Sequence, residues 1–242
     1  MRRRFFVDAV RNGQAAIEGE DARHLTRVLR AAPGQRYEIS DNANVYLAEV
    51  ESARKERVAF RVIEKLETRE AGARVILCAA LIKFDRFEWI VEKATELGVS
   101  EIVPVETARS ERGLERAAHK RLERWRRIAL EASQQSRRAR LPEVREPTSF
   151  HSALAQPASC RIALDEEEDN ALIVAALPRE LAPEDSIALL TGPEGGWTDR
   201  ERAALVEAGW RRVWLGPLIL RAETAAIAAV AIASQISAMR GH

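Results

Sequence analysis

Few residues of this 242-residue sequence could form a covalent or metal-bound scaffold. There are two cysteines, Cys78 and Cys160, and neither has a partner at the spacing of a disulfide pair or a zinc site. This scarcity excludes a disulfide-rich fold and predicts no metal site. It also favours a reducing compartment, so we expect the protein in the cytoplasm.

Long apolar runs are equally scarce. The longest covers residues 224–232, far fewer than the roughly 20 residues that a membrane-spanning helix needs. The arginine-rich N-terminus is not followed by the apolar stretch of a secretory signal. We therefore expect no membrane partner. The composition, with 46% hydrophobic and 31% charged residues, is that of an ordinary globular protein.

The net charge of +1 hides an uneven distribution of charge along the chain. Residues 1–36 contain eight arginines against four acids, and residues 109–145 contain twelve basic residues against five acids. Residues 146–199, in contrast, contain two arginines against eleven acids. The two basic segments predict a surface that binds a polyanion, with solvated helix faces as the alternative.

The first seventy residues are typical of a small β-barrel or sandwich. Alternation of apolar and polar residues predicts strands at 5–7, 14–17, 35–40, 45–50 and 58–66. A helix over residues 20–30 would carry Arg23, Arg27 and Arg30 on one face. Residues 67–73 lack apolar periodicity, so we expect a domain boundary there, between domains of residues 1–70 and 74–242.

The second domain alternates strands with helices, which predicts an α/β fold with a parallel sheet. Buried strands are expected at residues 74–82, 102–105, 161–165, 186–191 and 213–215. Helices are expected at residues 85–97, 114–138, 170–177, 199–208 and 222–239. Thr198 and Glu201 have the spacing of a capping box at the start of the fourth of these helices.

Two loops that follow buried strands are the candidate ligand site, because open α/β sheets bind ligands at such positions. Residues 191–197 contain three glycines, which leave backbone amides uncovered, but they match neither a P-loop nor a dinucleotide-binding motif. A plain strand-to-helix turn is the alternative. Residues 215–224 contain the aliphatic run 218–220, which indicates either deep packing or a ligand such as an adenine ring.

Together these loops carry a resemblance to a known family. Leu190-Thr191-Gly192-Pro193-Glu194-Gly195-Gly196 is followed about twenty residues later by Leu215-Gly216-Pro217-Leu218-Ile219-Leu220-Arg221-Ala222-Glu223-Thr224-Ala225. Further matching segments are Arg3-Arg4-Phe5-Phe6, His24-Leu25, Lys83-Phe84-Asp85, Arg109-Ser110 and Gln134-Gln135-Ser136. In these segments the chain resembles the RsmE family of SPOUT methyltransferases, which methylate N3 of a uridine in 16S ribosomal RNA. The basic run of residues 136–140 departs from the family pattern, which bears on RNA contact.

The resemblance implies a C-terminal α/β trefoil-knot domain that binds S-adenosyl-L-methionine, preceded by a PUA-like β-barrel. It also implies a homodimer that acts on 16S rRNA, within the small ribosomal subunit. The alternatives are a non-catalytic RNA-binding dimer with a degenerate knot and a SPOUT methyltransferase that acts on another RNA position. The cofactor-binding residues are then expected to be Leu190, Thr191, Gly192, Pro193, Glu194, Gly195, Gly196, Leu215, Gly216, Ile219, Leu220 and Arg221.

The chemistry that this family performs suggests roles for individual side chains. Removal of the imide proton of uridine puts negative charge on O2 and O4, which Arg221 could stabilise. Glu194 is the candidate base, with a structural role in the loop as the alternative, and Arg221 could instead form a structural pair with Glu223. The RNA-binding residues are expected in the basic segments and comprise Arg3, Arg4, Arg23, Arg27, Arg30, Arg109, Arg126 and Arg127.

Overall fold

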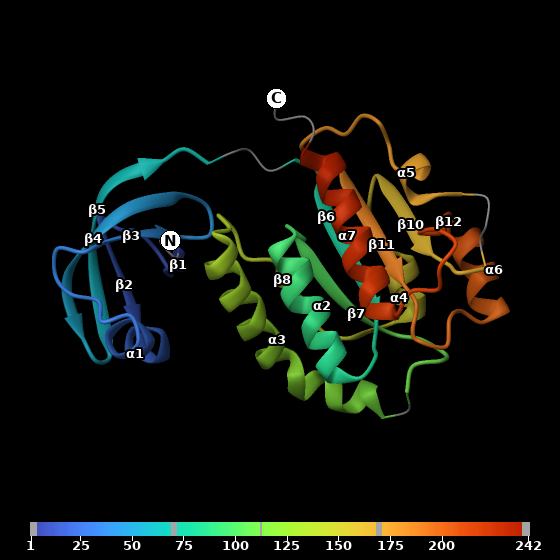
Figure 1. Cartoon of the computed structure of the whole chain (residues 1–242), viewed down its shortest axis with the longest axis horizontal. Helices are drawn as coiled ribbons and strands as arrows, with labels where there is room; N and C mark the ends of the chain where they lie inside the picture. Colours follow the sequence, from blue (N-terminus) through green and yellow to red (C-terminus); the bar gives the residue numbers. More distant parts are fainter. Residues whose placement is uncertain (1–3, 69–71, 112, 168–170, 239–242) are drawn as a thin grey trace. The chain divides into compact units, whose positions relative to one another are not determined.

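A computed structural model describes residues 4–68, 72–111, 113–167 and 171–238 of the chain. It divides into two compact units (Figure 1). The first comprises Met1–Arg69 together with Ser133–Leu141, and the second comprises Glu70–Ala132 and Pro142–His242. Each unit has a sheet of its own.

The first unit contains a five-stranded sheet with the order β1-β3-β4-β5-β2. Its strands are β1 (Arg4–Phe6), β2 (Gln14–Glu18), β3 (Arg36–Ser40), β4 (Val45–Arg54) and β5 (Arg57–Leu66). All pairs are antiparallel except β1 with β3. The alternating side chains Ala15, Ile17, Val58 and Phe60 turn inward and pack on Leu25 of helix α1 (Gly19–Arg27). The strands expected from alternation are therefore present, each within a few residues of its predicted bounds.

Residues 133–141 belong to the first unit, whereas the sequence placed them in the second domain. The carboxylate of Glu38 on β3 accepts hydrogen bonds from Arg4 and from Arg137. Ser40 donates to the carbonyl oxygen of Ala139 at 2.6 Å, and the amide of Leu141 donates to Asn42 at 2.7 Å. These polar contacts connect segments about a hundred residues apart in the chain, so no local sequence pattern could have predicted them.

The second unit contains a seven-stranded sheet in which all pairs are parallel. The strand order is β12-β10-β11-β6-β7-β8, and β9 also pairs with β7. The strands are β6 (Arg74–Ala80), β7 (Glu101–Glu106), β8 (Glu143–Val144), β9 (Thr148–Ser149), β10 (Cys160–Leu164), β11 (Ser186–Thr191) and β12 (Arg211–Val213). The predicted parallel sheet is confirmed, and the two-residue strands β8 and β9 are additions that periodicity could not detect.

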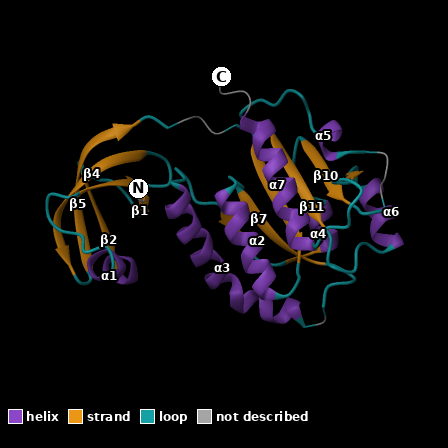
Figure 2. Cartoon of the chain, in the orientation of Figure 1, coloured by secondary structure: helices purple, strands orange, loops and turns teal. Residues whose placement is uncertain are grey.

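Helices cover both faces of this sheet (Figure 2). Their bounds are α2 (Phe84–Glu96), α3 (Leu114–Ser136), α4 (Phe150–Leu154), α5 (Ile173–Ala176), α6 (Asp199–Glu207) and α7 (Ala222–Ala238). The short helix α4 was not expected, because five residues are too few for a periodic pattern. No helix among the described residues is long and apolar enough to cross a membrane.

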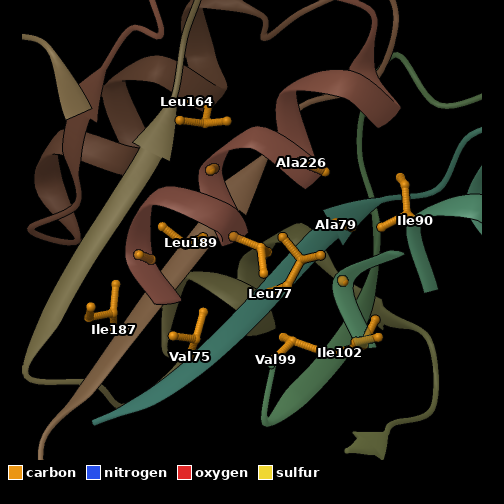
Figure 3. Close-up of a cluster of buried hydrophobic side chains, with 14 of the residues drawn as sticks. Val75, Leu77, Ala79, Ile90, Val99, Ile102, Leu164, Ile187, Leu189 and Ala226 are labelled. Atoms are coloured by element: carbon orange, nitrogen blue, oxygen red, sulfur yellow. The ribbon is translucent and has the colours of Figure 1, made fainter. Parts of the chain in front are cut away.

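The strands of the second unit are apolar on both faces because each face supports a separate core. Alternate residues of β6 point to opposite sides, so Val75 and Leu77 lie in one cluster while Ile76 and Cys78 lie in the other. Figure 3 shows the first cluster, in which Leu77 and Leu189 of the sheet lie near Ala226 of α7. Burial raises the pKa of the Cys78 thiol to about 12, so this cysteine acts as a core residue.

Candidate functional site

A hollow of about 600 Å³ lies at the carboxyl ends of β10, β11 and β12. This is the position where parallel α/β sheets place their ligands. Its walls are residues 164–166, 191–196 and 213–222, completed by Arg86 and Ala225. The volume lies in the range of sites for small organic ligands, and the two loops chosen from the sequence both line this one hollow.

The glycine-rich loop is held by the buried side chain of Trp197, whose ring nitrogen donates to the carbonyl oxygen of Leu164 at 2.7 Å. A Cβ at Gly192 would lie 3.1 Å from the Trp197 ring, a tight contact, so glycine lets the loop backbone pass close to this ring without displacing it. The predicted capping box is present: Thr198 and Glu201 bond reciprocally at the start of α6. The loop is therefore fixed at its C-terminal end by specific contacts.

The aliphatic loop lies open to solvent. Leu218 is 77% exposed and Ile219 is 89% exposed, and both line the hollow. Core packing, one of the two interpretations left open by the sequence, is therefore wrong for these side chains. Gly216 has φ +128°, and no atom lies within 4 Å of the position that a Cβ would occupy there. An apolar, uncovered wall of this kind suits a flat, largely apolar ligand group.

Acidic side chains form the wall contributed by β10. The Asp165 carboxylate is buried and accepts hydrogen bonds from Arg202 Nε at 3.1 Å and from Arg212 Nε at 2.7 Å. Burial by itself raises the pKa of Asp165, but the bonds from Arg202, the Glu167 amide and Arg212 outweigh it, so the pKa lies below its ordinary value. Asp165 is therefore a fixed negative charge at this wall.

Arg86 connects its own helix α2 with the glycine-rich loop and with helix α7. Its guanidinium forms an ion pair with Glu194 of the glycine-rich loop, and its Nε lies 4.0 Å from the carboxylate of Glu223 in α7. Arg221 lines the same hollow, and it has no ion-pair partner among the residues that the structure describes. The alternative in which Arg221 pairs with Glu223 is therefore not the arrangement found.

Most of the predicted cofactor-binding residues line the hollow. The lining residues among them are Thr191, Gly192, Pro193, Glu194, Gly195, Gly196, Leu215, Gly216, Ile219, Leu220 and Arg221. Leu190 is the exception: its side chain is buried in the core on the face of the sheet that holds Trp197. Arg86, Asp165 and Glu166 also line the hollow and were not expected from the sequence, although an acidic run directly after a buried strand could have indicated the last two.

The predicted RNA-binding arginines fall into several environments. The side chain of Arg4 is 11% exposed and forms an ion pair with Glu38, so little of it is open to RNA. Arg3 lies outside the described residues. Arg109 donates to the carbonyl oxygen of Gly195 at 2.7 Å and so lies against the glycine-rich loop. The remaining arginines are 23, 27, 30, 126 and 127, of which Arg23, Arg126 and Arg127 pair with nearby glutamates.

The described residues contain no group of three or more histidine, cysteine or acidic side chains arranged to hold a metal ion. The polar groups of the hollow are instead carboxylates and guanidinium groups, placed around an apolar wall. Such a set can bind an organic cation and hold an anionic group in position.

Comparison with known proteins finds similar proteins over most of the chain. Residues 69–234 match the model of an RNA methyltransferase domain, and residues 17–63 match that of an RNA methyltransferase PUA domain. The ribosomal RNA small subunit methyltransferase E of Bacillus subtilis is 36% identical over 93% of this chain and 92% of its own length. The protein of the same name from Synechocystis is 35% identical over 89% of this chain and 70% of its own length.

A solved structure extends the comparison to three dimensions. The crystal structure of a ribosomal RNA small subunit methyltransferase E from Neisseria gonorrhoeae, bound to S-adenosyl methionine, superposes with a TM-score of 0.87. It is 28% identical to this chain, and the match covers 98% of each chain. The chain thus belongs to the RNA methyltransferase family whose curated members are named ribosomal RNA small subunit methyltransferase E.

Proposed function

We propose that this protein transfers the methyl group of S-adenosyl-L-methionine to N3 of a uridine in 16S ribosomal RNA. The observation that carries the proposal is the 600 Å³ hollow, where the glycine-rich and aliphatic loops meet beside Arg221, whose guanidinium has no ion-pair partner among the described residues. The hollow combines space for a small cofactor with the exposed guanidinium of Arg221. A methyl transfer to an imide nitrogen needs both features.

The hollow fits S-adenosyl-L-methionine in shape and in charge. The exposed side chains of Leu218 and Ile219 offer an apolar surface for the adenine ring, and Gly216 leaves backbone groups open beside it. The carboxylates of Glu166 and Glu194 line the same space and complement the positive sulfonium and ammonium groups. When bound, the cofactor supplies an electrophilic methyl group whose departure leaves a neutral thioether.

The residues of this chain then have to orient the uracil ring and stabilise the charge that forms on it. Loss of the N3 proton spreads negative charge over O2 and O4 of the base. Arg221 lines the 600 Å³ hollow, which we call the cofactor hollow. Its guanidinium offers a planar set of donors to one of these oxygens. Because that charge exists mainly in the transition state, Arg221 should act on the rate more than on binding.

Two measurements test the proposed reaction. Mass mapping of 16S RNA after incubation with the purified protein and S-adenosyl-L-methionine should find one uridine that gains a methyl group at N3. In single-turnover experiments Arg221→Ala should lower the rate constant by roughly 10²–10³-fold, as loss of an oxyanion donor does, and Arg221→Lys should recover part of it. A normal rate constant in a folded Arg221→Ala protein would exclude this residue from the mechanism.

The RNA is expected to contact exposed arginines of the first unit. Arg27 ends α1 and Arg30 follows it with φ +52°, and both are exposed without an ion-pair partner among the described residues. Arg126 and Arg127 already pair with Glu123 and Glu131 on α3, which offsets their charge locally. We therefore assign the larger share of phosphate contact to Arg27 and Arg30.

Two further features of the family belong to the same proposal: the trefoil knot and the homodimer. Helix α7 packs against α2, β6 and β11 on one side, through residues such as Ala226 and Ala233. Its other side carries Ile227, Ala228 and Ala231, which are only partly buried in a single chain. A second copy would cover this strip of small residues. Light scattering after size exclusion should give the mass of a dimer, and Ala228→Glu should convert it to a monomer.

A further inference from the structure

Glu223 is a buried carboxylate that lacks a full set of partners. It lies in the first turn of α7 and is 3% exposed. Its Oε1 lies 4.0 Å from Arg86 Nε, and its Oε2 has no hydrogen-bond partner among the described residues. Buried carboxylate oxygens are normally bonded because their desolvation is costly, so such a group calls for a ligand or a chemical role.

Glu223 borders a second hollow of about 560 Å³, next to the cofactor hollow. Arg86 and Arg221 line both hollows, so the two spaces meet at these side chains. Trp89 of α2, which is 50% exposed, forms part of the second wall. Unpaired bases of RNA commonly stack on such exposed aromatic rings. The second hollow therefore offers a platform for a base directly beside the cofactor.

The other carboxylates that line the two hollows are occupied or open to water. Glu194 is paired with Arg86, Asp165 binds two arginines, and Glu88 receives two bonds from Arg124. Glu92 accepts from Lys93, while Asp85 and Glu166 are exposed. Glu223 alone among these lining residues is both buried and left with an unbonded oxygen. The earlier choice of Glu194 as base is thus less favourable than Glu223.

We propose that the second hollow receives the target uracil and that Glu223 is the proton acceptor for its N3–H. This inference rests on the proposed function. The uracil edge presents an acceptor, a donor and an acceptor, namely O4, N3–H and O2. Arg86 and Arg221 supply donors and Glu223 supplies an acceptor, which are the groups that such an edge requires. The same three groups that recognise the base thereby prepare it for methylation.

The proposed step conserves atoms and charge. The Glu223 carboxylate takes the N3 proton, and the electron pair of the broken N–H bond stays on N3, shared with O2 and O4. That pair forms the new bond to the methyl carbon while the carbon–sulfur bond breaks and its electrons remain on sulfur. Glu223 returns its proton to water after product release.

The arrangement also selects uracil over cytosine. Cytosine carries an unprotonated N3, so its lone pair would face the lone pairs of Glu223, and its amino group would face a guanidinium. Such mismatches leave polar groups unpaired and are strongly rejected by sites built for hydrogen bonding. Glu223→Gln replaces one acceptor by an amide that can also donate, so this variant should lose the preference.

The test uses the full-length protein and a short RNA fragment around the uridine found by mass mapping. Glu223→Gln should lower the single-turnover rate constant roughly 10²–10⁴-fold at neutral pH, and the rate should recover as alkali ionises N3. Cofactor affinity by calorimetry and the melting temperature should match the wild type. Glu207→Gln, a chemically identical change at an exposed position of α6, is the matched control and should keep the full rate.

Binding without cofactor supplies a readout that a merely structural role would not change. By fluorescence anisotropy the wild type should bind the fragment with uridine at least about tenfold more tightly than the fragment with cytidine, and Glu223→Gln should bind both alike. If Glu223→Gln does not fold, Glu223→Asp retains the carboxylate, and it should keep the preference for uridine and the wild-type pH profile at a reduced rate.

The outcomes separate the two proposals. If the wild type methylates no uridine N3 in 16S RNA, the proposed function fails and this inference fails with it. If the wild type does methylate N3 but Glu223→Gln keeps its rate within about threefold and its preference for uridine, only the inference is overturned. If Arg86→Ala reproduces both effects of Glu223→Gln, including the altered pH profile, then Glu223 acts only by holding Arg86, and the inference is again overturned.

Discussion

Replacing Asp165 by asparagine should destabilise the second unit, because this carboxylate is the anion between two arginines. Asp165 accepts from Arg202 Nε at 3.1 Å, from Arg212 Nε at 2.7 Å and from the Glu167 amide at 3.1 Å. Asparagine keeps the shape but loses the charge, and its amide group would point a donor at a guanidinium. Arg202, whose side chain is 9% exposed, would lose its principal counter-charge.

The loss of stability in Asp165→Asn depends on the ion pairs that Arg202 keeps. Removing one partner of a buried ion pair costs about 3–5 kcal/mol. Arg202 retains Glu167 at 3.0 Å and Asp199 at 3.5 Å, which favours the low end, about 3 kcal/mol. At roughly 2–4 °C per kcal/mol for a unit of this size, the melting temperature should fall by roughly 6–12 °C. Differential scanning calorimetry at pH 7 measures this value.

The dependence on pH gives a second check. The pKa of folded Asp165 lies below its ordinary value of 3.8, so its contribution to stability is fully present above pH 3.8 and is lost as the pH falls through the lower, folded value. The difference in melting temperature between wild type and Asp165→Asn should therefore shrink below pH 3.8. Asp199→Asn, at an exposed partner of Arg202, is the control and should leave the melting temperature unchanged. Equal melting temperatures for wild type and Asp165→Asn at pH 7 would refute the reasoning.

Three further predictions follow from the loops, the basic surface and the helix cap. Gly216→Val places a branched side chain at φ +128° and should weaken cofactor binding at least about tenfold by calorimetry, and unchanged affinity would place the cofactor elsewhere. Arg27→Ala with Arg30→Ala should lower the slope of log affinity for RNA against log salt by roughly 0.7–0.9 per lost phosphate contact, while Arg200→Ala on α6 should not. Thr198→Ala removes the capping box of α6 and should cost about 1 kcal/mol in chemical denaturation, and no change would mean that the cap is redundant.

Local sequence patterns determined the elements of both units. Alternation at period two marked the strands of the first sheet, and nearly continuous apolar runs marked strands such as β6 and β11, which are buried on both faces. The glycine-rich and aliphatic loops were also visible, because three glycines within five residues and a run of three aliphatic residues are unusual in a connecting loop. These features depend on neighbours in the chain, so a single sequence contains them.

The rest of the site depends on residues that only the folded chain brings together. Arg86 follows β6, Glu194 follows β11 and Glu223 begins α7, yet the parallel sheet places all three around one point. The sequence could name Glu194 as a carboxylate of the glycine-rich loop. It could not show that Arg86 pairs with Glu194, or that Glu223 is buried with an oxygen that has no hydrogen-bond partner among the described residues. Charge pairing and desolvation act through space and not along the chain, so the tertiary structure alone decided which of these acids is paired and which is buried.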